Sequence, residues 1–217
     1  MNFRAVLFDL DGTLLDTLED IARSVDSVLV KHNFSTHTLD DYRNFISDGI
    51  TMLITRSLPE DNRDKETINE CVEEFREAYS HGWNKKTKPY DGVIKTLEKL
   101  ATENLKIAVL SNKTHDFTIK CVNEFFPNIP FDFVLGQQTG IPPKPDPTGA
   151  MQISKNMGIL PAQILFVGDS AADMKTATAT GMFPVGVLWG FKTVEELRRS
   201  GAKTLIEHPK EILYLMV

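Results

Sequence analysis

The sequence predicts an α/β protein in which an all-helical domain is inserted into a doubly wound, parallel-sheet core. Residues 4–10 are mostly apolar, as in a strand buried on both faces of a parallel sheet. Residues 15–84 show only helical periodicity, whereas strand and helix patterns alternate from Gly92 onward. We therefore predict a core domain formed by residues 1–14 and 85–217, and a helical domain formed by residues 15–84.

The first strand ends in two carboxylates, Asp9 and Asp11. Residues at i and i+2 of a strand share a face, so both side chains can reach one small volume. A charged pair at the end of an apolar strand is costly unless it binds a cation or performs chemistry. The plainer interpretation is an Asp-Gly turn whose carboxylates cap backbone amides. A calcium loop is excluded, since its fifth, sixth and twelfth positions would hold Thr13, Leu14 and Asp20.

Helical spacing of apolar residues predicts the elements of the inserted domain, at about residues 18–29, 38–46, 50–58 and 68–82. Thr17 is expected to cap the first helix, with Asp20 as the acid of a capping box. Asp48 and Gly49 break the chain before the third helix, and the polar segment 84–89 is the expected hinge back to the core.

The remaining core elements follow from the same patterns. We predict strands at 106–110, 131–135, 164–167, 184–188 and 204–206, and helices at 93–100, 117–125, 148–157, 173–180 and 211–216. Right-handed crossovers place every strand-to-helix loop at one edge of such a sheet. Asp9, Asp11, Ser111 and Asp169 are therefore expected to meet at that edge, where doubly wound folds bind their ligands.

Composition excludes several classes of function. The 217 residues carry a formal charge of −6 and no basic run, which argues against partners such as nucleic acid or a membrane surface. No apolar run approaches the roughly 18 residues that span a bilayer, and no signal peptide is evident, so a cytoplasmic location is expected. Cys71 and Cys121 fall in separate helices and are expected to be free thiols, and the scattered histidines do not suggest zinc.

Four short motifs then occur in a meaningful order. The run Asp9–Thr13 reads Asp-x-Asp-Gly-Thr, and three further motifs follow at Ser111–Asn112–Lys113, at Lys144–Pro145–Asp146–Pro147 and at 168–173, which reads Gly-Asp-Ser-Ala-Ala-Asp. Together they resemble motifs I to IV of the haloacid dehalogenase (HAD) superfamily and cover nearly the whole chain. The resemblance implies a Rossmann-like HAD core with a helical cap of the C1 type.

Both the chemistry of these residues and the resemblance imply specific roles. Asp9 is expected to be the nucleophile that forms an aspartyl-phosphate, and Asp11 the general acid and then the general base. Ser111, the amide of Asn112 and Lys144 are expected to bind phosphate. The resemblance further implies Asp169 as a direct metal ligand, Asp173 as its support through water, and the backbone carbonyl of Asp11 as a ligand.

Electrostatics requires a cation among these acids. Asp9, Asp11, Asp169 and Asp173 would gather four carboxylates beside the single ammonium of Lys144. Two like charges 4 Å apart repel by about 4 kcal/mol at an effective dielectric of 20. Oxygen ligands beside phosphate favour Mg²⁺.

Each of the later motif residues also has a plainer interpretation. Ser111 alone resembles a helix N-cap, and Asp173 an acid favoured by a helix dipole. Lys144 could be a surface residue among prolines, and Lys113 is interpreted as an ordinary loop lysine with a possible phosphate contact.

The second acid of motif I, Asp11, narrows the choice among branches of the superfamily. Dehalogenases and phosphonatases of the superfamily lack it, which leaves ester-hydrolysing phosphatases and phosphomutases. The segment 46–58 resembles the cap of phosphoglycolate phosphatases, although Ser47 stands where Gly is usual. Gly49 and Arg56, with Arg43 as a further candidate, are expected to contact the substrate.

The expected function is Mg²⁺-dependent hydrolysis of a small phosphorylated metabolite such as 2-phosphoglycolate, by a monomer or homodimer. A β-phosphoglucomutase or a pyrophosphatase of the same fold is the first alternative. A non-catalytic module that binds Mg²⁺ and phosphate is the second.

Overall fold

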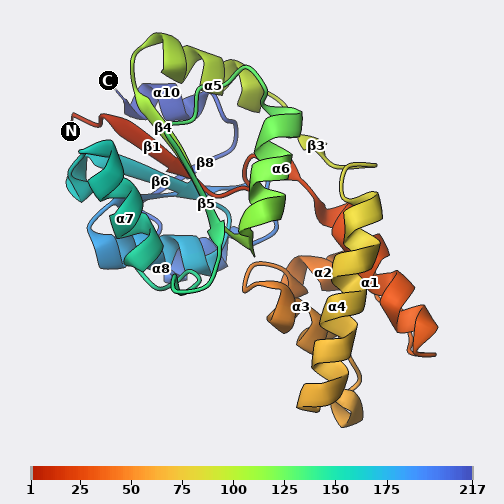
Figure 1. Ribbon diagram of the computed structural model, residues 1–217. Helices are drawn as coiled ribbons and strands as arrows, with labels where there is room; N and C mark the ends of the chain where they lie inside the picture. Colours follow the sequence, from red (N-terminus) through yellow and green to blue (C-terminus); the bar gives the residue numbers. More distant parts are fainter. Residues whose placement is uncertain (1, 217) are drawn as a thin grey trace. The chain divides into compact units, whose positions relative to one another are not determined.

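The computed structural model describes residues 2–216 and contains a six-stranded sheet in which neighbouring strands are parallel (Figure 1). The strands are β1 (Ala5–Phe8), β4 (Lys106–Thr114), β5 (Phe133–Gln137), β6 (Ile164–Gly168), β7 (Phe183–Val187) and β8 (Thr204–Ile206). Their order is β5-β4-β1-β6-β7-β8, which confirms the predicted doubly wound sheet. The order reverses at β1, so the carboxyl ends of β4, β1 and β6 border the crevice where such sheets bind ligands.

Helices cover both faces of this sheet (Figure 1). On one face lie α7 (Thr148–Met157) and α8 (Ala171–Thr180), and on the other α5 (Val93–Thr102) and α10 (Glu211–Leu215). Beside β4 and β5 lies α6 (His115–Phe125). Successive residues of a strand point to opposite faces. The side chain of Leu7 accordingly packs toward α7 and α8, and that of Phe8 toward α5 and α10.

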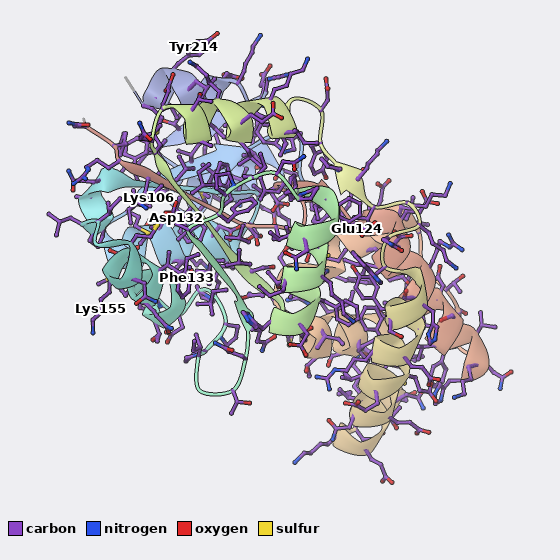
Figure 2. All side chains as sticks on the ribbon, turned by 45° about the horizontal axis from the view of Figure 1, so that its top comes forward. Lys106, Glu124, Asp132, Phe133, Lys155 and Tyr214 are labelled. Carbon is purple, nitrogen blue, oxygen red and sulfur yellow. The ribbon has the colours of Figure 1, made fainter. Side chains whose placement is uncertain are left out.

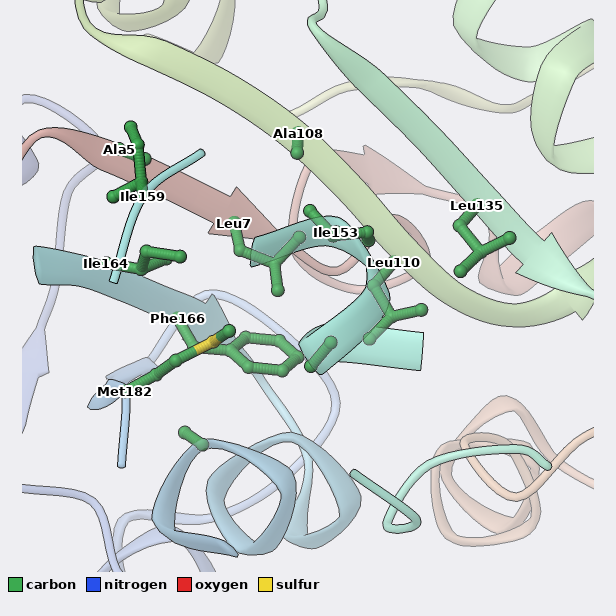
Figure 3. Packing of buried hydrophobic residues seen from close by; sticks show 12 residues of the cluster. Ala5, Leu7, Ala108, Leu110, Leu135, Ile153, Ile159, Ile164, Phe166 and Met182 are labelled. Atoms are coloured by element: carbon green, nitrogen blue, oxygen red, sulfur yellow. The ribbon is translucent and has the colours of Figure 1, made fainter. Parts of the chain in front are cut away.

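The core on the side of α7 and α8 is built from apolar side chains of β1, β4, β5 and β6, which pack with residues of the two helices (Figure 3). Its buried members are Ala5, Leu7, Ala108, Leu110, Leu135, Ala150, Ile153, Ile159, Ile164, Phe166, Ala177 and Met182. Most of the strand residues among them are fully buried, as expected for strands covered on both faces. This packing fixes the strand ends on which the site residues stand.

The structure separates into two compact units, Met1–Leu15 with Pro89–Val217 and Asp16–Lys88. The first unit holds the sheet. The second contains α1 (Leu18–Lys31), α2 (Leu39–Phe45), α3 (Ile50–Ser57), the 3₁₀ turn η1 (Glu60–Asn62) and α4 (Lys65–Gly82). At the junction of the units, β2 (Leu15–Asp16) pairs with β3 (Lys88–Pro89). Thus the chain enters and leaves the helical unit through two adjacent short strands.

Some local predictions were wrong. The strand predicted to end at Leu110 continues as β4 to Thr114, with a register shift between those two residues. Helix α8 begins two residues before the predicted start at Asp173. Two further elements, α9 (Val194–Arg199) and the 3₁₀ turn η2 (Pro161–Gln163), were not predicted. A signal for α9 was present, because Thr193 and Glu196 form a capping box at its start.

The predicted cap of α1 was also wrong. The side chain of Thr17 makes no capping hydrogen bond, and Asp20 turns to a distant segment instead. Its Oδ2 accepts hydrogen bonds from Lys86 N at 2.8 Å, Thr87 N at 2.8 Å and Thr87 Oγ1 at 2.9 Å. Asp20 is 1% exposed, so this carboxylate connects the start and the end of the helical unit from a buried position.

Two general predictions can be checked directly. Cys71 and Cys121 are free and buried, which confirms the predicted thiols, and burial raises the pKa of Cys121 to about 12. Within residues 2–216, no helix is long and apolar enough to cross a membrane.

Asp20→Ala is expected to lower the free energy of unfolding by about 2–4 kcal/mol, because two backbone amides and a hydroxyl lose their buried acceptor. The measurement is urea denaturation. Asp40→Ala, which removes an exposed carboxylate of the same unit, serves as the control and should change stability by less than about 0.5 kcal/mol. Equal stability of the two variants would show that the Asp20 connection contributes little.

Candidate active site

The site residues of the sheet unit stand at the carboxyl ends of three adjacent strands. Asp9 directly follows β1 and Asp169 directly follows β6. Ser111 and Asn112 lie in the irregular end of β4, between β1 and β5. The backbone amide of Asp9 donates to Val167 O at 2.9 Å, so the ends of β1 and β6 are directly connected. The structure therefore brings these residues to the edge predicted from the alternation of strands and helices.

Three acids form a buried group at this edge. Ligand oxygens of Asp9, Asp169 and Asp173 all lie within 4.8 Å of one another. The three residues are 7%, 1% and 0% exposed. Burial, reinforced by the charge of Asp173, raises the pKa of Asp9 well above its ordinary value and that of Asp169 to about 7. Gathering these carboxylates is costly, which is the situation in which proteins bind a cation.

Lys144 supplies the ammonium of this group. Its Nζ lies 2.8 Å from Asp9 Oδ1 and 2.6 Å from Asp173 Oδ1, and it donates to Leu110 O at 2.9 Å. Burial disfavours the ammonium, but the charges of Asp173 and Asp9 outweigh it and raise the pKa of Lys144. The residue is 4% exposed, so the interpretation of Lys144 as a surface lysine is wrong.

Asn112 holds the segment that carries this lysine. The Asn112 Nδ2 group donates to Lys144 O at 3.0 Å, and Lys144 N donates to Asn112 Oδ1 at 2.8 Å. This reciprocal pair joins the end of β4 to the loop of motif III. The sequence predicts a role only for the backbone amide of Asn112, because a long-range side-chain pair leaves no local pattern.

Asp173 has two partners at once. One oxygen accepts from Ser170 N at 3.0 Å and Ser170 Oγ at 2.6 Å, which completes a capping box at the start of α8. The other oxygen accepts from Lys144 at 2.6 Å. The helix-start interpretation of Asp173 and its place in the acid group therefore both hold.

Asp169 is positioned by two loops. Its Oδ1 accepts from Thr13 Oγ1 at 3.2 Å, and its Oδ2 accepts from Phe191 N at 2.8 Å. A Cβ built on Gly190 would lie 2.3 Å from Asp169 Cβ and 2.5 Å from Gly12 O. Only glycine permits this approach, so the loop after β7 is part of the site's construction.

The donor set fits a hard divalent cation. The acid group offers carboxylate oxygens only, and Mg²⁺ prefers such ligands. Three carboxylates face one ammonium, which leaves two negative charges in excess at formal ionisation. Asp9 and Asp169 would hold the ion, whereas Asp173 accepts from the Lys144 ammonium and from Ser170 and would support the site through these contacts.

The carboxylate of Asp11 does not join this group of three within the described residues, although all four acids were expected together. Lys113 Nζ lies 3.0 Å from each of its oxygens. Lys113 is therefore a half-buried partner of Asp11 in β4 and not the ordinary loop lysine that was predicted. The buried Ser111 Oγ accepts from Lys113 N at 3.2 Å.

The three candidates for substrate contact belong to the helical unit. Gly49 lies at the start of α3 with φ of 87°, a conformation that favours glycine. Arg56 donates to Phe45 O at 2.9 Å and pairs with Asp48 at 2.5 Å, and Arg43 lies 3.5 Å from Asp40. Ser47 has φ of 114°, which gives a physical reason for the usual glycine there. Contact of Gly49 or Arg56 with a substrate stays a prediction.

Known proteins resemble the chain over most of its length. A family model described as haloacid dehalogenase-like hydrolase matches residues 6–187. A phosphoglycolate phosphatase from Psychrobacter arcticus is 31% identical over 205 residues, covering 92% of this chain and 89% of that protein. A phosphoglycolate phosphatase from Aquifex aeolicus is 32% identical over 188 residues, covering 87% and 86%.

A solved structure agrees with these sequence relatives. A protein from Lactobacillus delbrueckii subsp. bulgaricus, provisionally assigned as a phosphoglycolate phosphatase, matches with a TM-score of 0.93 and 26% identity. The match covers 100% of this chain and 99% of that chain. The similarity thus extends well beyond the motif residues.

Gly190→Ala is expected to weaken Mg²⁺ binding by about tenfold or more, because the added methyl group would displace Asp169. Titration calorimetry measures the affinity directly. Gly82→Ala, where no atom lies within 4 Å of the added Cβ, is the matched control. Identical affinities in both variants would contradict a role for the 190 loop in holding Asp169.

Proposed function

The chain belongs to the haloacid dehalogenase-like hydrolases, and from this we propose that it is a Mg²⁺-dependent phosphatase of small phosphorylated metabolites. The observation that carries the proposal is the buried group of Asp9, Asp169 and Asp173 around Lys144, at the carboxyl ends of the central strands. Such a group can hold a divalent cation and present one nucleophilic carboxylate to phosphorus. The names of the relatives favour 2-phosphoglycolate as the substrate.

We assign the nucleophile to Asp9. Leu10 N at 2.7 Å and Lys144 Nζ at 2.8 Å both approach its Oδ1, so we assign the attack to Oδ2. In the first step a bond forms between Asp9 Oδ2 and phosphorus, and the bond from phosphorus to the ester oxygen breaks. Splitting hydrolysis through an aspartyl-phosphate replaces one difficult displacement by two easier ones.

Asp11 completes both steps as the acid and base. It donates a proton to the departing ester oxygen, and then accepts a proton from the water that attacks the aspartyl-phosphate. That second attack breaks the bond between Asp9 and phosphorus and releases inorganic phosphate. Asp11 is thereby returned to its protonated form, and the cycle is balanced.

The other core residues offset the negative charges of the phosphoryl group and of the carboxylates. Lys144 neutralises the transferring phosphoryl group, and Ser111 and the amide of Asn112 donate to its oxygens. Asp9 and Asp169, with the backbone carbonyl of Asp11, would hold Mg²⁺, and Asp173 would support the site through its contact with Lys144. When bound, the ion offsets the excess negative charge of the carboxylates and allows a phosphate dianion to enter.

We propose further that the helical unit is the cap that selects the leaving group. In sequence it is inserted between β1 and β4, two strands that carry site residues. The core residues described above are assigned to phosphate binding, metal binding and proton transfer. Few of them are left to recognise the rest of a substrate. Gly49 and Arg56 are the proposed substrate contacts of this unit. The cytoplasmic location and the monomeric or dimeric state remain predictions.

Asp9→Asn is expected to lower kcat for phosphate release by at least about a thousandfold, because an amide is not a nucleophile. The assay follows phosphate release from 2-phosphoglycolate and from p-nitrophenyl phosphate without an acceptor sugar. Borohydride reduction during turnover should label Asp9. The exposed Asp116→Asn variant is the control.

Three results would change the assignment. Label on another residue would refute Asp9 as nucleophile. Turnover only with an acceptor sugar would favour a mutase, and release from pyrophosphate alone a pyrophosphatase. Binding of Mg²⁺ and phosphate without any turnover would indicate the non-catalytic module.

Removal of Mg²⁺ by chelator is expected to abolish turnover, and Mg²⁺ should restore it while raising the melting temperature. Ca²⁺ should bind but inhibit, because its looser coordination does not maintain the in-line geometry. Asp169→Asn should remove the thermal shift that Mg²⁺ produces in the native chain. Full activity in excess chelator would contradict the metal assignment.

A further inference from the structure

Lys113 and Asp11 form an ion pair separate from the Lys144 group. The ammonium lies 3.0 Å from both carboxylate oxygens, and the two side chains are 8% and 14% exposed. Surface ion pairs of long side chains contribute little because they are solvated and mobile. This pair is shielded and symmetric, so the carboxylate of Asp11 is held in one orientation by both of its oxygens.

The backbone beneath Lys113 is restrained on both sides. Lys113 N donates to Ser111 Oγ at 3.2 Å, and Lys113 O accepts from Thr118 Oγ1 at 3.2 Å. A Cβ on Gly136 of β5 would lie 2.7 Å from Lys113 O, which shows how closely the neighbouring strand approaches. The lysine stem therefore begins at a fixed point in the structure.

The backbone around Asp11 is equally restrained. Leu14 N and Leu15 N both donate to Leu10 O at 2.9 Å, and Gly12 N donates to Leu15 O at 2.8 Å. These bonds close a tight turn around Asp11. The ion pair thus connects two segments whose backbones are already fixed. Its effect is therefore to restrict the side-chain torsions of Asp11.

We infer that Lys113 is a positioning residue that holds the carboxylate of Asp11 in place for proton transfer to and from the substrate. The inference rests on the proposed function of Asp11 as general acid and base. A general acid or base must lie within hydrogen-bond reach of the proton that it transfers, and small displacements are costly. In the structure Lys113 contacts both oxygens. When one oxygen of Asp11 carries or exchanges the proton, Lys113 continues to donate to the other.

The role has a specific chemical consequence. In the first step, an alkoxide leaving group needs a proton from Asp11, whereas p-nitrophenolate departs readily without one. The ratio kcat/KM reports events up to the departure of the leaving group. Loss of positioning should therefore lower kcat/KM for alkyl phosphates much more than for p-nitrophenyl phosphate. Attack of water on the aspartyl-phosphate is common to all substrates and does not affect this comparison.

The experiment compares kcat/KM for 2-phosphoglycolate, or another alkyl phosphate that the native chain hydrolyses, with that for p-nitrophenyl phosphate. Lys113→Met, which keeps the length but not the charge, is expected to lower the alkyl value about 100-fold and the p-nitrophenyl value less than about threefold. Lys113→Arg should restore most of the loss, because it can donate to both oxygens of a carboxylate. Asp11→Asn should show the same selectivity as Lys113→Met.

A matched control lies on the same strand. Lys106, at the start of β4, pairs with Asp132 (Figure 2), whereas Lys113 lies near the end of the same strand. Lys106→Met removes the ammonium of a more exposed Lys–Asp pair on the same strand and should leave both kcat/KM values unchanged. If Lys113→Met fails to fold, Lys113→Gln carries the same comparison, with a single amide in place of the ammonium.

The outcomes separate this inference from the proposed function. If the native chain hydrolyses no phosphate ester, the proposed function fails. If it does, and Asp11→Asn lowers kcat/KM mainly for alkyl phosphates but the Lys113 variants do not, only the positioning role is wrong. An equal loss for all substrates, with weaker inhibition by inorganic phosphate, would instead make Lys113 a phosphate-binding residue and overturn the inference.

Discussion

The ammonium of Lys144 lies between the carboxylates of Asp9 and Asp173, and all three groups are almost without contact with solvent. Removing three charges from water costs several kcal/mol each, and only close contact and additional hydrogen bonds compensate for this. The lysine meets that condition by also donating to Leu110 O, and its own backbone is held by Asn112. One side chain thus joins the ends of β1 and β4 to the start of α8.

Strong local patterns explain why much of this fold could be predicted. The apolar run of β1 and the alternation after Gly92 required a parallel sheet, and a parallel sheet brings Asp9 and Asp169 to one edge. That inference needs only the order of the elements. The C-terminal glycine of α7, Gly158, similarly ended a helix where expected, with its φ of 67°.

The missed features share a different cause, since each depends on a partner far away in the sequence. Asp20 resembled a capping acid, and only tertiary structure shows that it binds the backbone of residues 86 and 87. Lys113 resembled a loop lysine because the predicted strand stops at Leu110, three residues before it. Its partner Asp11 is more than a hundred residues distant in the sequence. Gly190 gave no sequence signal for its approach to Asp169. The identities of the site acids were therefore predictable, but their hydrogen-bond partners were not.

Because β2 and β3 pair with each other, the chain enters and leaves the inserted helical unit at adjacent positions. If the helical unit were removed, a short loop between these two positions would be enough to connect β1 to the rest of the core. Insertions, deletions or a different set of helices in residues 16–88 would leave the strand order and the acid group of the core unaltered. In evolutionary terms, the residues for phosphoryl transfer and those of the insert can change independently, so one catalytic core can acquire new substrates by exchange of a single segment.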